Sequence, residues 1–300
     1  MTMKQVRVCL ANGIELDVVD TGPRDAPALV FLHGFPDSHR TWRHQIAQFS
    51  DRYRCIAPDQ RGYRHSSKPE GVANYTPDKM IGDVFQLADA LGLAQFTVVG
   101  HDWGGAIAWG VALLGQKTRV PRAVICNAPH PVLFQKLLYT NPVQRAASQY
   151  MRVFRDTDND AMVRQFGLTA ILAKGFGEGT VLKALPDDHE QLLAEYMNPD
   201  AAIAMLNWYR GSPLEIPAMD APFEIPASYT PPAIPPLDIP TLVVWAMDDI
   251  ALPPENLDGL EDSIRDLTVV KVPDSGHFVQ WEQPQMVNAA IEEFLARTGG

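Results

Sequence analysis

The residue in this sequence whose surroundings are most typical of chemistry is Asp102. A β-branched and aromatic run at 96–99 stops at Gly100-His101-Asp102-Trp103-Gly104, and an apolar, helix-like segment follows. This layout predicts a sharp strand-to-helix turn that lifts one side chain clear of a sheet, and glycines are favoured there because a Cβ would crowd the backbone. A raised carboxylate can attack saturated carbon and leave an ester on the enzyme. Aspartate is also a common helix N-cap, but the preceding strand and the flanking glycines favour a nucleophile.

A pair of aspartates and a histidine follow Asp102 in the order nucleophile, acid, histidine that accompanies this kind of turn. His277 lies in a loop after an apolar run at 267–272, where its imidazole could deprotonate the water that attacks an ester. The acid that would orient the imidazole and stabilise its charged form is Asp248 or Asp249, which are adjacent in the chain. These residue types predict nucleophilic catalysis in two steps, with either aspartate as the supporting acid.

The elements that would position these groups alternate between strand-like and helix-like patterns. Residues 6–19 predict a hairpin that turns at Asn12-Gly13, a strong hairpin signal. Continuous apolar runs predict strands that are buried on both faces, and segments of helical periodicity lie between them. The alternation predicts a mostly parallel sheet flanked by helices. The expected strands are 28–32, 54–57, 96–99, 123–126, 242–245 and 267–272, and the expected flanking helices are 41–49, 77–91, 105–114 and 284–296.

The alternation is interrupted between residues 131 and 239. The stretch 212–240 is rich in proline, which excludes regular helix and favours an extended return to the sheet. The sequence therefore predicts a core domain of 1–130 and 240–300 and an inserted helical cap of 131–239. A disordered linker between two domains is the alternative, and it is disfavoured because a strand-like segment follows. The helices expected in the cap are 143–154, 160–172, 188–197 and 200–209.

Composition places the chain among ordinary globular proteins. Its 300 residues, 46% hydrophobic and 20% charged, can bury the core of one large domain with an insertion. The net charge of −11 disfavours nucleic-acid and anionic-membrane partners, and no signal-like or membrane-spanning apolar run is present. Cys9, Cys55 and Cys126 are expected to be buried free thiols in a reducing, cytoplasmic setting. No group has metal-ligand spacing, so no metal or cofactor is expected.

Five motifs are spread along the chain: His33-Gly34-Phe35-Pro36, Asp59-Gln60-Arg61-Gly62-Tyr63, Gly100-His101-Asp102-Trp103-Gly104-Gly105, Leu206-Asn207-Trp208-Tyr209-Arg210 and Gly276-His277-Phe278. Together they resemble the signature set of epoxide hydrolases with the α/β-hydrolase fold. The resemblance implies that fold, with an inserted cap, and the cofactor-free hydrolysis of small apolar epoxides to vicinal diols. It also implies epoxide and water as partners, no nucleic acid or membrane, and a monomer or a homodimer.

The resemblance implies roles for residues around Asp102. The family pattern Trp-Gly-x-x-Asp selects Asp249 over Asp248 as the acid, although this chain has alanine in place of the glycine. The backbone N–H groups of Phe35 and Trp103 would form the oxyanion hole, and the bond before Pro36 would be cis.

Opening an epoxide also needs an acid for the departing alkoxide, and the family supplies it from two cap tyrosines. Tyr209 matches the second of these tyrosines and Tyr150 resembles the first, with Tyr139 and Tyr196 as alternatives. Tyrosines are otherwise most often packing residues. The side chains expected to line the substrate pocket are His33, Pro36, Trp208 and Phe278.

Three other functions fit part of the same pattern. A haloalkane dehalogenase would share Asp102, Trp103 and His277. Its second halide donor typically comes from an asparagine where this chain has Phe35, or from a tryptophan elsewhere, and the motif around Trp208 favours the tyrosine-bearing cap helix instead. A fluoroacetate dehalogenase would need arginines where Trp103 and Ala106 stand. A non-catalytic small-molecule receptor on the same fold would not need the nucleophile, the acid and the histidine in order. The complete set favours an epoxide hydrolase.

Overall fold

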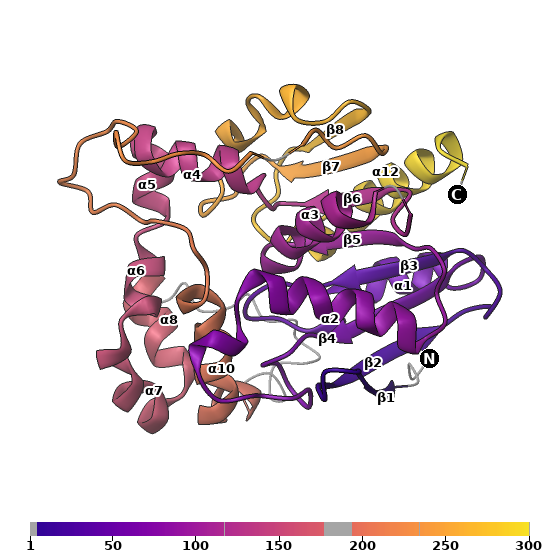
Figure 1. The fold of residues 1–300 in the computed structure, drawn as a ribbon, viewed down its shortest axis with the longest axis horizontal. Coiled ribbons are helices and arrows are strands. Elements are labelled where there is room, and N and C mark those ends of the chain that lie inside the picture. Colours follow the sequence, from indigo (N-terminus) through magenta and orange to yellow (C-terminus); the bar gives the residue numbers. More distant parts are fainter. Residues whose placement is uncertain (1–4, 117, 177–193, 234, 300) are drawn as a thin grey trace.

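A single sheet runs through the middle of the protein (Figure 1). The computed structural model describes residues 5–116, 118–176, 194–233 and 235–299. Within these residues eight strands pair in the order β1-β2-β4-β3-β5-β6-β7-β8. Pairing is antiparallel from β1 through β2 to β4 and parallel for the others. The strands are β1 (Gln5–Cys9), β2 (Glu15–Thr21), β3 (Ala28–Leu32), β4 (Arg54–Asp59), β5 (Thr97–His101), β6 (Ala123–Cys126), β7 (Thr241–Ala246) and β8 (Leu267–Val272).

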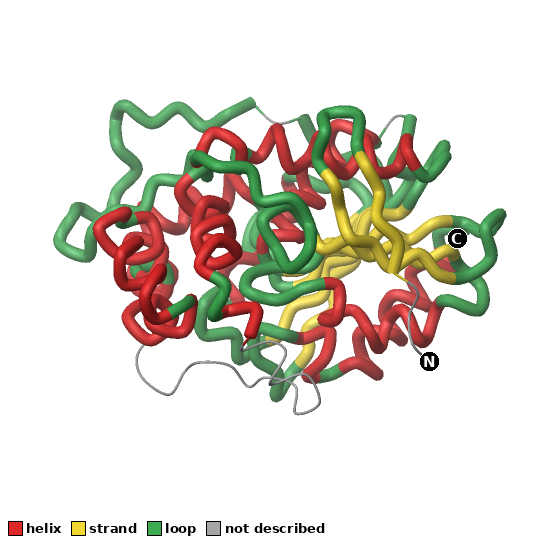
Figure 2. Tube along the Cα trace, turned by 90° about the horizontal axis from the view of Figure 1, so that it is seen from below, coloured by secondary structure: helices red, strands yellow, loops and turns green. Residues whose placement is uncertain are grey.

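Helices cover both faces of the twisted sheet, as Figure 2 shows. Because side chains alternate along a strand, Val30 and Leu32 of β3 join one hydrophobic core, whereas Leu29 and Phe31 join the other. Burial on both faces explains why these strands read as continuous apolar runs. The first core packs against α2 (Pro77–Ala90) and α3 (Trp103–Gly115), and the second against α1 (Arg43–Phe49) and α12 (Pro284–Arg297).

The predicted mostly parallel α/β architecture is confirmed. The N-terminal hairpin pairs Gln5 with Val19 and Cys9 with Glu15. The strand predicted at 54–57 continues to Asp59, and the helix predicted at 41–49 begins as a 3-10 turn, η1 (His39–Trp42), before α1.

Four parallel strands end at one edge of the sheet. β3, β5, β7 and β8 are each followed by a turn or loop that holds one of the candidate site residues Phe35, Asp102, Asp249 and His277. In α/β sheets, ligands commonly bind at the carboxyl ends of the strands. The topology therefore gathers residues from four distant parts of the sequence.

Between β6 and β7 the chain forms a group of helices to one side of the sheet (Figure 1). The helices α6, α7, α8 and α10 pack on one another. The described residues from 212 to 240 form no helix or strand apart from an isolated bridge at Leu237, as the proline content predicts. The helices are α4 (Pro131–Thr140), α5 (Pro142–Ala147), α6 (Tyr150–Arg155), η3 (Thr157–Asn159), α7 (Asp160–Phe166), α8 (Leu168–Phe176) and α10 (Pro199–Arg210).

Two predicted cap helices are interrupted. The one at 143–154 is divided into α5 and α6, because the chain leaves the helix at Ser148. The one at 160–172 is divided at Gly167, which ends α7 with a φ of 75° that glycine adopts readily. The helix predicted at 188–197 lies largely outside the described residues, and the last predicted helix is α10.

The three cysteines are free, but not all of them are buried. Cys55 and Cys126 lie in interior strands without exposed surface, whereas Cys9 is exposed. β1 is an edge strand, so alternate side chains face solvent, and the prediction of a buried thiol is wrong for Cys9. Within the described part of the chain, no helix is long and apolar enough to cross a membrane. The same residues contain no cluster of three or more His, Cys, Asp or Glu side chains that could hold a metal ion.

Candidate active site

Asp102 occupies the turn between β5 and α3 in an unusual backbone conformation. Its φ is 52° and its ψ is −124°, a combination that costs energy for a residue with a side chain. A Cβ on Gly104 would collide with the carbonyl groups of Leu32 and His33, and a Cβ on Gly34 would overlap the Asp102 side chain. Glycine at both positions therefore permits the close approach of the β3 loop to the turn. The predicted strand-to-helix turn is confirmed.

The carboxylate of Asp102 is held by backbone N–H groups. The Phe35 N–H donates to Oδ1 at 2.7 Å, and the backbone N–H of Trp103 helps to lower the pKa of the carboxyl group. The peptide bond between Phe35 and Pro36 is cis, as predicted. Donors in this arrangement can stabilise negative charge that develops on the bound oxygen.

His277 lies between two carboxylates. Its Nδ1 is 2.7 Å from Oδ2 of Asp249, and its Nε2 is 3.5 Å from Oδ2 of Asp102. The Asp249 side chain has no exposed surface, whereas Asp248 is exposed to solvent. The structure thus brings Asp249, and not Asp248, to the imidazole.

His277, Asp102 and Asp249 each favour the charged form of the others. Burial disfavours the charged form of His277, yet Asp249 and Asp102 raise its pKa well above that of a free histidine. Burial likewise acts against ionisation of the two carboxyl groups, but the hydrogen bonds and charge of His277 lower the pKa of each below its usual value. The site therefore favours an imidazolium between two carboxylates before substrate reacts.

Two tyrosines from the helices between β6 and β7 line the same cavities as Asp102. Tyr150 begins α6 and Tyr209 lies near the end of α10, with 6.0 Å between their ring centroids. The ring of Tyr209 packs edge-on against Phe35 and Trp103, each at 5.0 Å. Burial and the negative charge of Asp102 both raise the pKa of the two phenols. Both hydroxyl groups therefore keep their protons at neutral pH and can act as donors.

Two cavities meet at Asp102, Tyr150 and Tyr209, which line both of them. The larger has a volume of about 630 Å³ and extends past His277 and Phe278. The smaller has a volume of about 290 Å³. A molecule reacting at Asp102 therefore has room for a substituent on either side. The smaller cavity is lined mostly by apolar side chains, among them Ile81, Ala106, Ile107, Leu113, Phe134 and Met151.

The four side chains predicted to line the substrate pocket divide into two pairs. Pro36 and Phe278 line the larger cavity, but His33 and Trp208 line neither cavity at Asp102. The ring of His33 is fully buried, with hydrogen bonds at both nitrogens. Trp208 is equally buried, and its indole N–H donates to the carbonyl of Arg61. The prediction is wrong for these two residues, because their polar atoms are bonded within the protein.

The alternative tyrosines point elsewhere. The hydroxyl of Tyr139 donates to Glu215 at 2.7 Å, and that of Tyr196 donates to the carbonyl of Pro36 at 3.1 Å. Neither residue lines the two cavities at Asp102.

Comparisons with known proteins agree with this arrangement. The family model of the α/β hydrolase fold matches residues 27–284. Epoxide hydrolase 1 of Caenorhabditis elegans is 32% identical, over 94% of this chain and 68% of its own. A solved structure described as a novel epoxide hydrolase of this superfamily, from metagenomes of hot environments, is 66% identical with a TM-score of 0.96, over 98% of this chain and 99% of that one. This chain belongs to the epoxide hydrolases of the α/β hydrolase superfamily.

A further solved epoxide hydrolase shows the same fold. The enzyme from Bacillus megaterium, solved with an inhibitor, is 31% identical with a TM-score of 0.80, and the match covers 98% of this chain and 100% of that one.

One residue that supports the epoxide hydrolase site was not predicted from the sequence. Asn127, directly after β6, donates to Oδ2 of Asp249 at 2.8 Å and accepts from the backbone N–H of Ala246 at 2.9 Å. The other oxygen of Asp249 accepts from the backbone N–H groups of Ala251 and Leu252 at 2.9 and 3.0 Å. The position of Asn127 after a predicted parallel strand was the available signal, because that strand ends at the same sheet edge.

Two side chains, Glu282 and His101, support the loop of His277 by hydrogen bonds. Glu282 accepts from the backbone N–H groups of Gly276 at 2.7 Å and Phe278 at 3.1 Å, on either side of the histidine. Nε2 of His101 lies 2.8 Å from the carbonyl oxygen of His277, and burial lowers the pKa of His101 to about 3. His101 is therefore neutral, and its Nε2–H donates a hydrogen bond to the carbonyl oxygen of His277.

Proposed function

We propose that this protein hydrolyses epoxides to vicinal diols in two steps, with an ester on Asp102 as the intermediate. The observation that carries the proposal is the position of Asp102 between the imidazole of His277 and the phenols of Tyr150 and Tyr209, where two cavities meet. The apolar lining of the smaller cavity supports apolar substituents on the epoxide. The relatives named as epoxide hydrolases support the same reaction.

In the first step, Oδ2 of Asp102 attacks one carbon of the oxirane ring. Oδ1 is held by the Phe35 N–H, whereas Oδ2 faces Nε2 of His277 at 3.5 Å, so Oδ2 is the oxygen that forms the new bond. As the Oδ2–C bond forms, the C–O bond of the ring at that carbon breaks, and the ring oxygen takes a proton from Tyr209 or Tyr150. The phenolate that is left regains its proton from solvent.

In the second step, His277, which has released its extra proton to solvent after the ester formed, takes a proton at Nε2 from a water molecule whose oxygen attacks Cγ of the ester. The negative charge forms on Oδ1, where Phe35 and Trp103 offer their backbone N–H groups. Collapse breaks the Cγ–Oδ2 bond, and the proton held by His277 passes to the departing alkoxide. The diol leaves, the proton that remains on the new carboxyl group passes to His277, and Asp102 is restored as a carboxylate with one oxygen that came from water.

Ester formation also prepares His277 to act as a base. Before reaction, Asp102 and Asp249 both raise the pKa of the imidazole against the effect of burial. The ester of Asp102 carries no charge, so one of these two influences is lost and the pKa falls. The imidazole thus becomes able to accept a proton from water only after the ring has opened.

A single-turnover reaction with excess enzyme in ¹⁸O-labelled water tests the proposal. The first diol should contain no ¹⁸O, and the peptide that contains Asp102 should gain one ¹⁸O, because water attacks Cγ and not the substrate. Direct attack of water on the epoxide would place the label in the first diol and contradict the ester.

A bromoalkane in a parallel assay separates the other functions. Bromide release without diol formation from any epoxide would support a dehalogenase, and no product from either substrate would support a receptor.

A further inference from the structure

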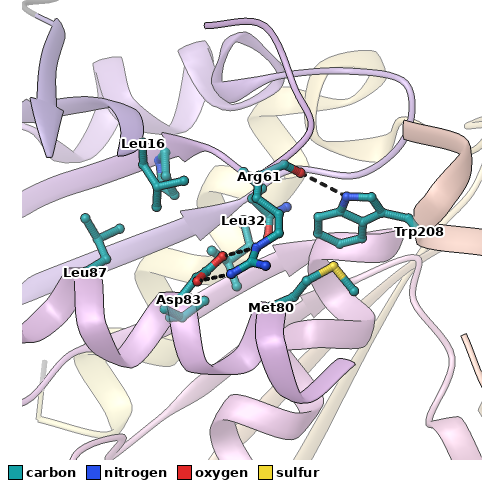
Figure 3. Close-up of a pocket in the computed structure, with 10 residues that line it drawn as sticks. Leu16, Leu32, Arg61, Met80, Asp83, Leu87 and Trp208 are labelled. Carbon is teal, nitrogen blue, oxygen red and sulfur yellow. Dashed lines mark hydrogen bonds and ion pairs between the residues drawn. The ribbon is translucent and has the colours of Figure 1, made fainter. Parts of the chain in front are cut away.

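The helix that carries Tyr209 is attached to the sheet layer through the neighbouring residue, Trp208 (Figure 3). Trp208 has no exposed surface, and its indole N–H donates to the carbonyl oxygen of Arg61 at 3.0 Å. Arg61 follows β4 and belongs to the sheet layer, whereas Trp208 belongs to α10. Consecutive residues project about 100° apart around a helix. Fixing Trp208 on the sheet layer therefore also fixes the direction in which Tyr209 projects toward Asp102.

The carbonyl that receives the indole N–H belongs to a residue held by a buried ion pair (Figure 3). Nε and Nη2 of Arg61 donate to the two carboxylate oxygens of Asp83 in α2, both at 2.6 Å. Nη1 donates to the carbonyl of Asn74 at 2.7 Å, and Asp83 accepts a further bond from Asn12 at 2.8 Å. A guanidinium fork with two matched acceptors has little freedom to move. The acceptor of Trp208 is therefore anchored in the sheet layer.

The packing around Trp208 leaves α10 little room to shift. A Cβ on Gly62 would press on Tyr75 and on Ala204 of α10, and a Cβ on Gly211 would overlap the carbonyl of Tyr75. This end of the cap is therefore seated closely on the loops after β4. Tyr150 differs in its surroundings, since its ring contacts are with cap residues, at 5.3 Å from Phe154 and 4.4 Å from Phe176.

We propose that Trp208, Arg61 and Asp83 are positioning residues that hold the Tyr209 hydroxyl within reach of the epoxide oxygen. The inference rests on the proposed function, in which Tyr209 is an acid for ring opening. Its consequence is specific to one step: losing the indole bond slows formation of the Asp102 ester and leaves hydrolysis of that ester unchanged, because hydrolysis depends on His277.

The deciding variant is Trp208→Phe, which removes the N–H donor and keeps an aromatic ring. Rapid quenching followed by mass spectrometry gives the rate at which the ester forms and, after dilution of the epoxide, the rate at which it decays. Ester formation should slow roughly tenfold, as expected when a catalytic group is displaced slightly, and ester decay should change by less than about twofold.

A double-mutant cycle with Tyr209→Phe distinguishes positioning from a general loss of structure. If Trp208 acts through Tyr209, adding Trp208→Phe to Tyr209→Phe should slow ester formation no further. Arg61→Lys keeps the charge and the main-chain carbonyl but loses the fork, and should slow the same step about threefold. If Trp208→Phe does not fold, the same cycle with Arg61→Lys decides the question.

Trp42→Phe is the matched control, because Trp42 is a fully buried tryptophan on the opposite side of the sheet. It should lower the melting temperature without changing either step. The inference is overturned if Trp208→Phe slows both steps equally, or slows ester formation as much in the Tyr209→Phe background as alone. If Tyr209→Phe slows ring opening and Trp208→Phe does not, only the inference fails. If Tyr209→Phe itself opens the epoxide at the normal rate, Tyr209 is not the acid for ring opening and the inference falls, while Tyr150 remains the acid of the proposed function.

Discussion

The two sides of the site are built in different ways. The floor, defined as Asp102, Asp249 and His277, comes from the ends of parallel strands and is fixed by backbone hydrogen bonds and close glycine contacts. The roof, defined as Tyr150 and Tyr209, comes from two cap helices and is fixed by packing of aromatic rings and, on the Tyr209 side, by the hydrogen bond from Trp208 to Arg61. In the proposed reaction the floor makes and breaks every bond to the enzyme, whereas the roof supplies one proton. Changes to the floor should therefore stop the reaction, and changes to the roof should only slow it.

The largest effect is expected from Asp102→Asn. Asparagine tolerates a positive φ and can still accept from the Phe35 N–H, so the turn should form while the nucleophile is lost. Diol production should fall by at least ~10⁴-fold, and no epoxide should add to the protein mass. A normal melting temperature is the control for folding. A variant that retained even about 1% of the activity would remove Asp102 from the mechanism.

The next effect is expected from His277→Gln, which removes the base and leaves the nucleophile. Steady-state turnover should fall about 10²- to 10⁴-fold, and the protein should gain the mass of one epoxide as the ester accumulates. His65→Gln is the matched control, because His65 is exposed, and it should turn over normally without a mass gain. Loss of turnover without any added mass would show that the histidine is needed before the ester forms, against the proposed order.

A smaller effect is expected at the roof, from Tyr150→Phe and Tyr209→Phe. Each variant should slow ring opening about tenfold, and the double variant about 10²- to 10³-fold, since general acids contribute on this scale. Tyr229→Phe is the control, because Tyr229 packs on Tyr139 away from Asp102. The measurement is the rate of ester formation in a single turnover. If the double variant opened the epoxide at the normal rate, neither tyrosine would be an acid for ring opening, and both would serve only in packing.

The same division decides what could be predicted from the sequence. The floor was predictable because each of its three residues follows an apolar strand within a few positions, and parallel strands bring the ends of 97–101, 241–246 and 267–272 to one edge. The order of Asp102, Asp249 and His277 along the chain then identified them as nucleophile, acid and histidine. Each of these signals lies in a short stretch of sequence, and the parallel topology of the sheet then brings the three residues close together.

The roof was harder to predict from the sequence, because the contacts of its side chains depend on how the inserted helices pack against the sheet layer. Trp208 and Tyr209 are neighbours in one motif, yet only Tyr209 lines the cavities, while Trp208 is bonded to Arg61. The periodicity of the sequence does not determine which side of α10 faces the sheet layer and which faces the cavities. His33 lies outside the cavities for a related reason: both of its ring nitrogens form hydrogen bonds with backbone groups inside the protein.

The smallest expected effect comes from Asn127→Ala, which tests how far the floor depends on its supports. Burial raises the pKa of Asp249, and His277, the Leu252 N–H and the Asn127 side chain lower it. Without Asn127 the Asp249 carboxylate binds a proton more tightly, so the pKa of His277, already raised, should rise further. Neutral imidazole is present above that pKa and is lost as the pH falls through it.

The acid limb of ester hydrolysis in Asn127→Ala should therefore move to higher pH, by less than about one unit. The rate on the alkaline plateau should fall only about threefold, because the Ala251 and Leu252 N–H groups still hold the other oxygen of Asp249. The decay of the isolated ester, measured across pH, checks both numbers. If the acid limb moved to lower pH, Asn127 would act on His277 by some route other than Asp249. If the alkaline rate fell as much as in His277→Gln, Asn127 would itself belong to the floor.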